Sequence, residues 1–298
     1  MHASFVVSVK AFGDFVIACN CLRRIEELPS DRSRPKLLAG DHLRALAGAL
    51  GLESEVHFIT TRGKYPAAYD VHGSGIWQAL GSLVAMRSQF RRLPPECELI
   101  FDRVGWRERF LAARLERRCL FPAENIYISI AQTLRSVGYG LRSLDNSRAS
   151  PRDLRPQGNA VIFPASRVAK KRIPAAVVGR VMDQLAEAGL RGEVVRLAGE
   201  TLDLPPHVSA RSIDHNFDAL ITTIRASDLV VSADSLPAHL AEYFGIPTYV
   251  IFPAPNEYWL PLSAFQDRSW NVFDDQHSLT SWLSRRVVAH DGERACKV

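Results

Sequence analysis

Several features of membrane and secreted proteins are missing from this sequence. No apolar run reaches the about 18 residues that would indicate a membrane-spanning helix. Residues 1–14 lack the basic stretch, the long apolar stretch and the cleavage site of a secretory signal. The five cysteines are an odd number with irregular spacing, and they form no Cys-x-x-Cys pair or Cys/His ligand set. These absences argue against a disulfide framework and a structural zinc site, and we expect a cytoplasmic protein.

What the sequence does contain is typical of a globular chain with two domains. It has 298 residues, of which 47% are hydrophobic and 23% are charged, enough to bury a sizeable core in each domain. In the first half, apolar runs of strand length alternate with helical patterns. The expected strands are 5–9, 36–39, 55–59, 98–101 and 126–130, and the expected helices are 15–28, 40–50 and 106–118.

The second half repeats this alternation. Its expected strands are 160–163, 193–197, 228–231, 248–252 and 270–273, and its expected helices are 174–189, 216–226, 236–244 and 278–288. Between the halves, 141–159 is polar and is interrupted by two prolines, as in a linker. Alternating strands and helices predict parallel sheets. The predicted fold class is therefore α/β, with two Rossmann-like domains, 1–150 and 151–298, that face a central cleft.

The charge balance is basic, with a formal net charge of +5. Arginines gather in 87–92, 103–118 and 142–155. Each cluster has an ordinary interpretation as a solvated helix face or a linker. Together they also suit an anionic partner, either a phosphorylated substrate or an anionic membrane surface. No helix-turn-helix, zinc finger or RNA-binding signature is present, so nucleic acid is not an expected partner.

The most informative segment is 229–253. A short buried strand runs into the small polar turn 232–235, and a helix then opens near Pro237 and ends at Gly245 before the strand 248–252. In such a βαβ unit the turn lies at the carboxyl end of the sheet, next to the N-terminus of the helix. The free N–H groups and the dipole of that helix favour a phosphate or a diphosphate.

The first expected strand also leads into a loop with functional residues, Lys10, Gly13 and Asp14. Gly13 permits a tight turn or the close approach of a ligand. Asp14 has two interpretations at the start of the next helix. It is a favoured N-cap residue, worth about 1 kcal/mol, or a carboxylate that is available as a general base.

The first strand of the second half is followed by Ser166, which can offer a hydroxyl and an N–H to an anion. The cations 170–172 come just before Pro174, a residue that suits the first turn of a helix. Such a run is either a solvated surface or, at the carboxyl end of a strand, a place where Lys171 meets a diphosphate. Glu200 follows another strand and can meet a ribose hydroxyl.

Three segments resemble the motifs of glycosyltransferase family 9, the ADP-heptose:lipopolysaccharide heptosyltransferases. Residues 11–16 resemble the family's LGD loop and the start of its first helix. Residues 163–174 resemble its PGAS-like turn and its Lys-x-Trp-Pro. Residues 234–248, with Asp234, His239 and the Gly-Ile-Pro-Thr at their end, resemble its DTGxxHLAxxhGxPT segment.

The resemblance implies a GT-B fold and an inverting glycosyltransferase that uses neither a metal nor another cofactor. The donor would be a nucleotide sugar, most simply ADP-heptose. The acceptor would be lipopolysaccharide or another lipid-linked envelope glycan, reached in peripheral contact with the inner face of the cytoplasmic membrane. By the same resemblance, 1–150 is the acceptor side and 151–298 binds the nucleotide sugar, with the last helix packing back on the first domain.

The resemblance also implies roles for particular residues. Asp14 would deprotonate the acceptor hydroxyl, and Lys171 with the Asp234-Ser235 turn would hold the donor diphosphate. His239 would either contact the phosphate or pack in the interior. A carboxylate repels phosphate, so Asp234 would fix its turn through backbone N–H groups, or accept a hydroxyl or an adjacent cation.

The sequence departs from the family pattern at several motif positions, among them Pro253, which stands where a glycine is usual. Leu236 and Ala165 stand where glycines are expected, and Ile173 replaces a tryptophan. A leucine resists the positive φ and the close phosphate approach that a glycine allows. The alternatives are therefore a catalytically inactive GT-B protein that binds a nucleotide or acts as a scaffold, or a GT-B nucleotide-sugar epimerase. Within 60–95 no motif is present. Residues 72–75 with Trp77 are interpreted as a loop, either an ordinary surface loop or a mobile loop over the acceptor side.

Overall fold

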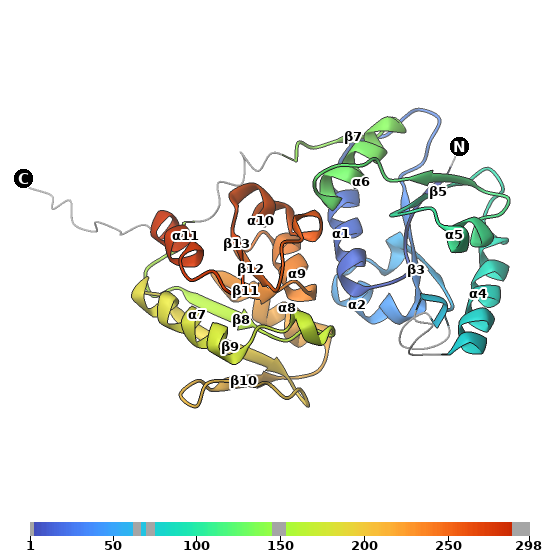
Figure 1. Ribbon diagram of the computed structural model, residues 1–298. Coiled ribbons are helices and arrows are strands. Elements are labelled where there is room, and N and C mark those ends of the chain that lie inside the picture. Colours follow the sequence, from blue (N-terminus) through green and yellow to red (C-terminus); the bar gives the residue numbers. More distant parts are fainter. Residues whose placement is uncertain (1–2, 62–66, 70–74, 145–152, 288–298) are drawn as a thin grey trace, which may run out of the picture. The chain divides into compact units, whose positions relative to one another are not determined.

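The computed structural model describes residues 3–61, 67–69, 75–144 and 153–287. Contacts divide the chain into two compact units, Met1–Leu144 (unit 1) and Asp145–Val298 (unit 2). Each unit contains one large parallel sheet with helices around it (Figure 1). The predicted α/β class is therefore confirmed, whereas the expected boundary between residues 150 and 151 lies outside the described residues.

Unit 1 contains a parallel sheet with the strand order β4-β3-β1-β5-β6. The strands are β1 (Ser4–Ser8), β3 (Lys36–Gly40), β4 (Val56–Ile59), β5 (Glu98–Phe101) and β6 (Glu116–Cys119). The chain runs from β1 outward through β3 to β4, and then returns to β5 on the other side of β1. The strand order thus reverses between β1 and β5, and ligands of open α/β sheets bind at such a switch point.

The helices of unit 1 follow its strands. They are α1 (Phe12–Arg23), α2 (Arg44–Ala49), α4 (Ile76–Phe90), α5 (Trp106–Leu111) and α6 (Ile126–Ser136), with 3-10 turns η1 (Asp41–Leu43), η2 (Glu53–Glu55) and η3 (Ala67–Tyr69). A short antiparallel pair joins β2 (Ile25–Glu27) to β7 (Gly140–Leu141). In one core cluster, Phe5 and Val7 of β1 pack with Leu83, Met86 and Phe90 of α4. One side of α4 is therefore buried.

Unit 2 has a parallel sheet in the order β10-β9-β8-β11-β12-β13. The strands are β8 (Asn159–Phe163), β9 (Arg191–Leu197), β10 (Ala210–Ile213), β11 (Leu229–Ala233), β12 (Thr248–Phe252) and β13 (Trp270–Val272). The helices are α7 (Ala175–Glu187), α8 (Phe217–Arg225), α9 (Leu236–Phe244), α10 (Leu262–Asp267) and α11 (Ser278–Arg286), with 3-10 turns η5 (Ala169–Lys171) and η6 (Glu257–Trp259). Here the switch point lies between β8 and β11.

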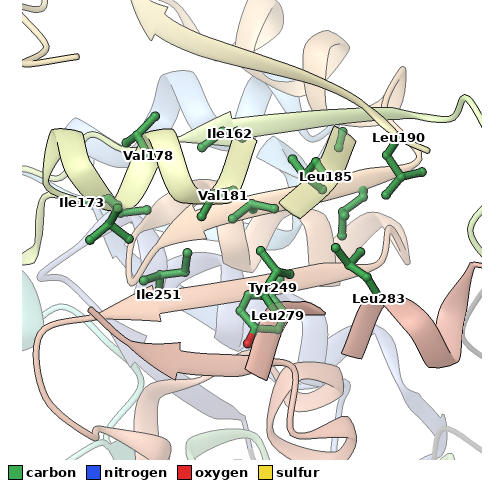
Figure 2. Packing of buried hydrophobic residues seen from close by; sticks show 14 of the residues in the cluster. Ile162, Ile173, Val178, Val181, Leu185, Leu190, Tyr249, Ile251, Leu279 and Leu283 are labelled. Atoms are coloured by element: carbon green, nitrogen blue, oxygen red, sulfur yellow. The ribbon is translucent and has the colours of Figure 1, made fainter. Parts of the chain in front are cut away.

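The strand β12 shows why its sequence is a continuous apolar run. Tyr249 and Ile251 belong to the cluster that α7 and α11 cover, shown in Figure 2, whereas Val250 and Phe252 belong to a second cluster that includes residues of α9 and α10. Successive side chains of a strand point to opposite faces, so both faces of this sheet are buried. The last helix, expected to pack on the first domain, contributes three residues to the core of unit 2, Leu279, Trp282 and Leu283.

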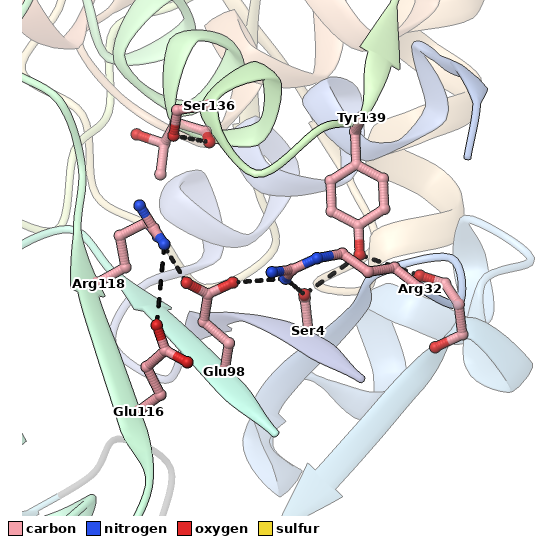
Figure 3. A network of polar contacts seen from close by, with 9 residues as sticks. Ser4, Arg32, Glu98, Glu116, Arg118, Ser136 and Tyr139 are labelled. Atoms are coloured by element: carbon pink, nitrogen blue, oxygen red, sulfur yellow. Dashed lines mark hydrogen bonds and ion pairs between the residues drawn. The ribbon is translucent and has the colours of Figure 1, made fainter. Parts of the chain in front are cut away.

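A polar network stabilises the amino ends of β1 and β5 (Figure 3). The buried Glu98 carboxylate accepts hydrogen bonds from Arg32 (2.8 Å) and Arg118 (2.6 Å). The Tyr139 hydroxyl donates to the hydroxyl of Ser4 at 3.1 Å. Because this network lies at the opposite end of the sheet from the carboxyl edge, it belongs to the scaffold and not to a ligand site.

Two of the predicted elements in the first half are wrong. Residues 126–130, expected as a strand, form the first part of α6, whose N-cap Asn125 accepts a hydrogen bond from the Tyr127 N–H at 3.0 Å. The β-branched residues there suggested a strand, but the capping asparagine starts a helix. The helix expected over 106–118 ends at Leu111, and Glu116–Cys119 is the edge strand β6. Its charged sequence gives no apolar signal because a sheet edge faces solvent.

Two other boundaries also differ. The helix expected over 15–28 ends at Arg23 and is followed by β2. The linker expected over 141–159 is shorter, because Leu154 is buried in the core of unit 2 and its N–H donates to the Arg286 carbonyl at 2.9 Å. None of the helices in the described part of the chain is long and apolar enough to cross a membrane.

Candidate functional site

The clearest site in unit 2 lies at its switch point, between the carboxyl ends of β8 and β11. The loop after β8 supplies Lys171, and the turn after β11 supplies Asp234. The Lys171 ammonium nitrogen donates to a carboxylate oxygen of Asp234 at 2.6 Å. Only 9% of the Asp234 side chain is exposed, against 31% for Lys171. Of the three roles considered for Asp234, the structure shows the acceptance of an adjacent cation.

The third residue of this site is His239, which lies near the start of α9 and is buried. Burial lowers its pKa from the ordinary 6.5 to about 4; the nearby Asp234 carboxylate opposes this effect and the Lys171 ammonium adds to it. The imidazole is therefore neutral near pH 7. Lys171, which is 63 positions from Asp234 in the sequence, thus lies close enough to both Asp234 and His239 for their charges to interact.

The lowered pKa of His239 predicts a pH-dependent stability. Between pH 6.5 and about 4, the unfolded chain binds a proton at this imidazole while the folded chain does not. The free energy of unfolding of unit 2 should therefore fall as the pH drops through this window, by about 2–4 kcal/mol in total from this group. Denaturant unfolding of the wild type and of His239→Gln at several pH values measures it. Identical pH slopes for the two proteins would contradict the prediction.

The turn before α9 is built by Ser235 and the residues around it. Ser235 is the N-cap residue of α9, but its hydroxyl donates to the Ala233 carbonyl at 3.2 Å instead of capping the helix. The helix then continues through Pro237 in its first turn and ends at Gly245, whose φ is 68°. The predicted helix start and the glycine stop are both confirmed.

Leu236 and Ala165, which stand where the family pattern has glycines, do not strain the backbone. Leu236 is the first residue of α9, where the backbone is right-handed. In the described residues, positive φ outside glycine occurs at Gln157 and Arg268, and not at Leu236 or Ala165. The strain expected from a leucine in place of a glycine is therefore absent, because this turn needs no left-handed residue.

Ser166 and Glu200 both support their own loops. The buried Ser166 hydroxyl accepts a hydrogen bond from the Val168 N–H at 3.3 Å, and the Ser166 carbonyl accepts one from the Arg172 guanidinium at 3.1 Å. One carboxylate oxygen of Glu200 accepts the Leu197 N–H at 3.0 Å. Ser166 lies in the same loop as Lys171. Glu200 follows β9, one strand farther from the switch point.

In unit 1, Gly13 and Asp14 lie at the start of α1, next to the carboxyl end of β1. The N-cap of this helix is Ala11, so Asp14 is its third residue and not its cap. The capping interpretation of Asp14 is therefore wrong. A carboxylate in the first turn is still favoured by the helix dipole, and the Asp14 side chain is partly exposed. Gly13, a helical residue, makes no tight turn.

The carboxyl edge of unit 1 also contains a residue that the sequence analysis missed, Asp102. Lys10, just beyond β1, donates to both carboxylate oxygens of Asp102, just beyond β5, at 2.9 and 2.8 Å. The same ammonium lies 5.2 Å from the centre of the Tyr69 ring. An ion pair thus bridges the switch point in unit 1 as another does in unit 2. The position of Asp102 directly after an apolar strand was the available signal.

Within the ranges that the structure describes, no group of three or more His, Cys, Asp or Glu side chains could hold a metal ion. The charged groups that converge at the two switch points are instead lysine–aspartate pairs.

Comparison with known proteins shows a shared fold at low sequence identity. No protein-family model matches the chain, and no curated protein sequence matches it. Among solved structures, a family 9 glycosyltransferase from Veillonella parvula aligns at a TM-score of 0.62 and 12% identity, over 95% of this chain and 90% of that one. This structure and those below are glycosyltransferases of the GT-B class, so the predicted GT-B fold is confirmed.

Two heptosyltransferases from E. coli have similar structures. The heptosyltransferase WaaC, solved with ADP-2-deoxy-2-fluoro heptose, aligns at a TM-score of 0.58 and 12% identity over 95% of this chain and 98% of that one. The ADP-heptose LPS heptosyltransferase II aligns at a TM-score of 0.53 and 13% identity over 91% and 90%. The chain is thus similar in fold to family 9 glycosyltransferases along nearly its whole length.

Proposed function

We propose that this protein is a glycosyltransferase that moves a sugar, most simply heptose, from a nucleoside-diphosphate donor to lipopolysaccharide or another envelope glycan. The observation that carries the proposal is the group of Lys171, Asp234 and His239 at the switch point of unit 2, beside the N-terminus of α9. Support comes from WaaC, which has this fold and was solved with ADP. The donor base proposed here is therefore adenine.

The proposed chemistry needs a base and a site for the leaving group. The acceptor hydroxyl would lose its proton to the Asp14 carboxylate as its oxygen bonds to the anomeric carbon. The bond from that carbon to the diphosphate would break with inversion, and the diphosphate would leave with the electron pair. Lys171 and the N–H groups at the start of α9 would stabilise the added negative charge. The proposal requires neither a metal nor another cofactor.

Neutral His239 has a limited part in this scheme. Because its pKa is lowered to about 4, it would not present a positive charge to the diphosphate at pH 7. It would hold the Lys171–Asp234 pair in a low-dielectric setting, where charge–charge interactions are stronger than in water. Its proposed role is therefore to support the pair, while Lys171 provides the positive charge.

A thermal-shift screen of the full chain against ADP, UDP, GDP, CDP and dTDP tests the donor assignment. A ligand at about 100 times its dissociation constant should add about 2.7 kcal/mol of stability, and ADP should give the largest shift. ADP release from ADP-heptose that requires lipopolysaccharide would support transfer. Turnover of the donor without any acceptor would indicate an epimerase or hydrolase instead. No shift with any nucleotide would favour the inactive scaffold.

A further inference from the structure

The helix α4 exposes an apolar stripe that the proposed reaction does not use. Its members are Ile76, Trp77, Leu80 and Val84, which are 62%, 82%, 43% and 61% exposed. At about 100° per residue, the four positions fall within about 100° of the helix circumference. Trp77 was expected in a loop, and the structure places it in the first turn of this helix. We call these four residues the α4 stripe.

A different, adjoining side of α4 packs against the core. Leu83, Met86 and Phe90 are buried in the core cluster of unit 1 and hold α4 against the sheet. The α4 stripe is not needed for that packing. Large apolar residues exposed singly are normal, but four on one helix side form a patch that indicates an interaction site.

The charges around the stripe indicate what kind of surface it meets. From residue 75 to residue 92 the chain contains three arginines and no aspartate or glutamate. Arg91 comes two helical turns after Val84, so it extends the stripe with a positive charge, and Arg91 and Arg92 are both exposed. Arg87 lies over the ring of Phe110, 4.1 Å from its centre. Phe110 belongs to α5, which lies next to α4 (Figure 1).

Two members of the other basic clusters form ion pairs within unit 1. Arg118 pairs with the buried Glu98, and Arg142 pairs with Glu26 at 2.7 Å. Arg91 and Arg92 are the exposed arginines of the 87–92 cluster, and they follow directly on α4.

We infer that the α4 stripe, with Arg91 and Arg92, docks on an anionic lipid bilayer. Tryptophan and aliphatic side chains on one side of a helix enter the boundary between headgroups and acyl chains, while arginines beside them bind lipid phosphates. Four apolar residues are too few for a stable protein dimer, which uses about 20–30 residues a side. They suffice for reversible binding to a membrane when basic residues assist.

Co-sedimentation of the full chain with vesicles tests this inference. We expect binding to phosphatidylcholine vesicles that contain phosphatidylglycerol, little binding to phosphatidylcholine alone, and weaker binding at high salt. The pair Trp77→Ser with Val84→Ser should lower the partition coefficient at least about tenfold. Arg91→Glu with Arg92→Glu should remove the preference for phosphatidylglycerol. Leu28→Ser, an exposed apolar residue of unit 1 outside α4, is the matched control and should bind like the wild type.

Quenching of tryptophan fluorescence by brominated lipids gives a second measurement. Trp77→Phe should still bind the vesicles but should lose a large part of the quenching. Equal binding by the wild type and the serine pair would overturn the inference. A second result would also overturn it: sedimentation velocity shows a dimer that the serine pair abolishes, and neither the wild type nor the variants bind vesicles. Vesicle binding needs neither donor nor acceptor, so its failure would leave the proposed reaction untouched.

Discussion

Replacing Asp14 with asparagine is expected to lower the rate of sugar transfer by about 10²–10⁴-fold while leaving the donor affinity unchanged. An amide keeps the shape of the carboxylate but cannot accept the proton of the acceptor hydroxyl. Asp14 lies in the first turn of α1 in unit 1, whereas the proposed diphosphate site is in unit 2. Nucleoside diphosphate release in the presence of lipopolysaccharide gives the rate, and titration with the donor gives the affinity.

The control must separate a base from a residue that only supports its helix. Asp218 occupies the first turn of α8 and is exposed, so Asp218→Asn removes a comparable interaction with a helix dipole. Each variant should lose at most about 1 kcal/mol of stability, but only Asp14→Asn should lose turnover. If Asp14→Asn lost stability and kept its rate, Asp14 would be a structural residue and the proposed base would be wrong.

The parallel core of both sheets was predictable because its strands are buried on both faces. Apolar runs of strand length predicted β5 and, apart from β10, the strands of unit 2, and the glycine at 245 predicted the end of α9. The strands that the prediction missed are at edges or are short, and the 15-residue helix α4 was missed in a segment without a motif. The charged strand β6 and the three-residue strand β2 bury few apolar residues, so they leave little periodic signal.

The residues of the candidate site could be predicted because each lies in a short segment that resembles a family motif. Motif resemblance predicts a site at Lys171, Asp234 and His239, and the first two also follow strands. The structure brings the three side chains together. The partnerships themselves were not predictable from local patterns. The pair of Lys10 with Asp102 joins residues 92 positions apart, and only the strand order places them at the same switch point.

The Lys171–Asp234 pair gives a prediction that separates ligand binding from folding. Lys171→Met should weaken nucleoside-diphosphate binding about 10–100-fold, since a charge-assisted hydrogen bond contributes about 1.5–3 kcal/mol. It should also destabilise unit 2 by about 1–3 kcal/mol, because the nearly buried Asp234 carboxylate loses the cation 2.6 Å away. Asp234→Asn should keep the binding, since Lys171 remains. Calorimetric titration and denaturant unfolding measure the two effects.

The double variant decides which role Lys171 has. Combining Lys171→Met with Asp234→Asn removes both charges, so stability should recover while the affinity remains well below that of the wild type. Arg211→Met is the matched control, because Arg211 pairs with Glu193 at 2.8 Å on β9 and β10, away from the switch point, and it should bind nucleotide normally. If the double variant bound the diphosphate as tightly as the wild type, the lysine would serve only to neutralise Asp234. The diphosphate would then have to be held by other donors, such as the N–H groups at the start of α9.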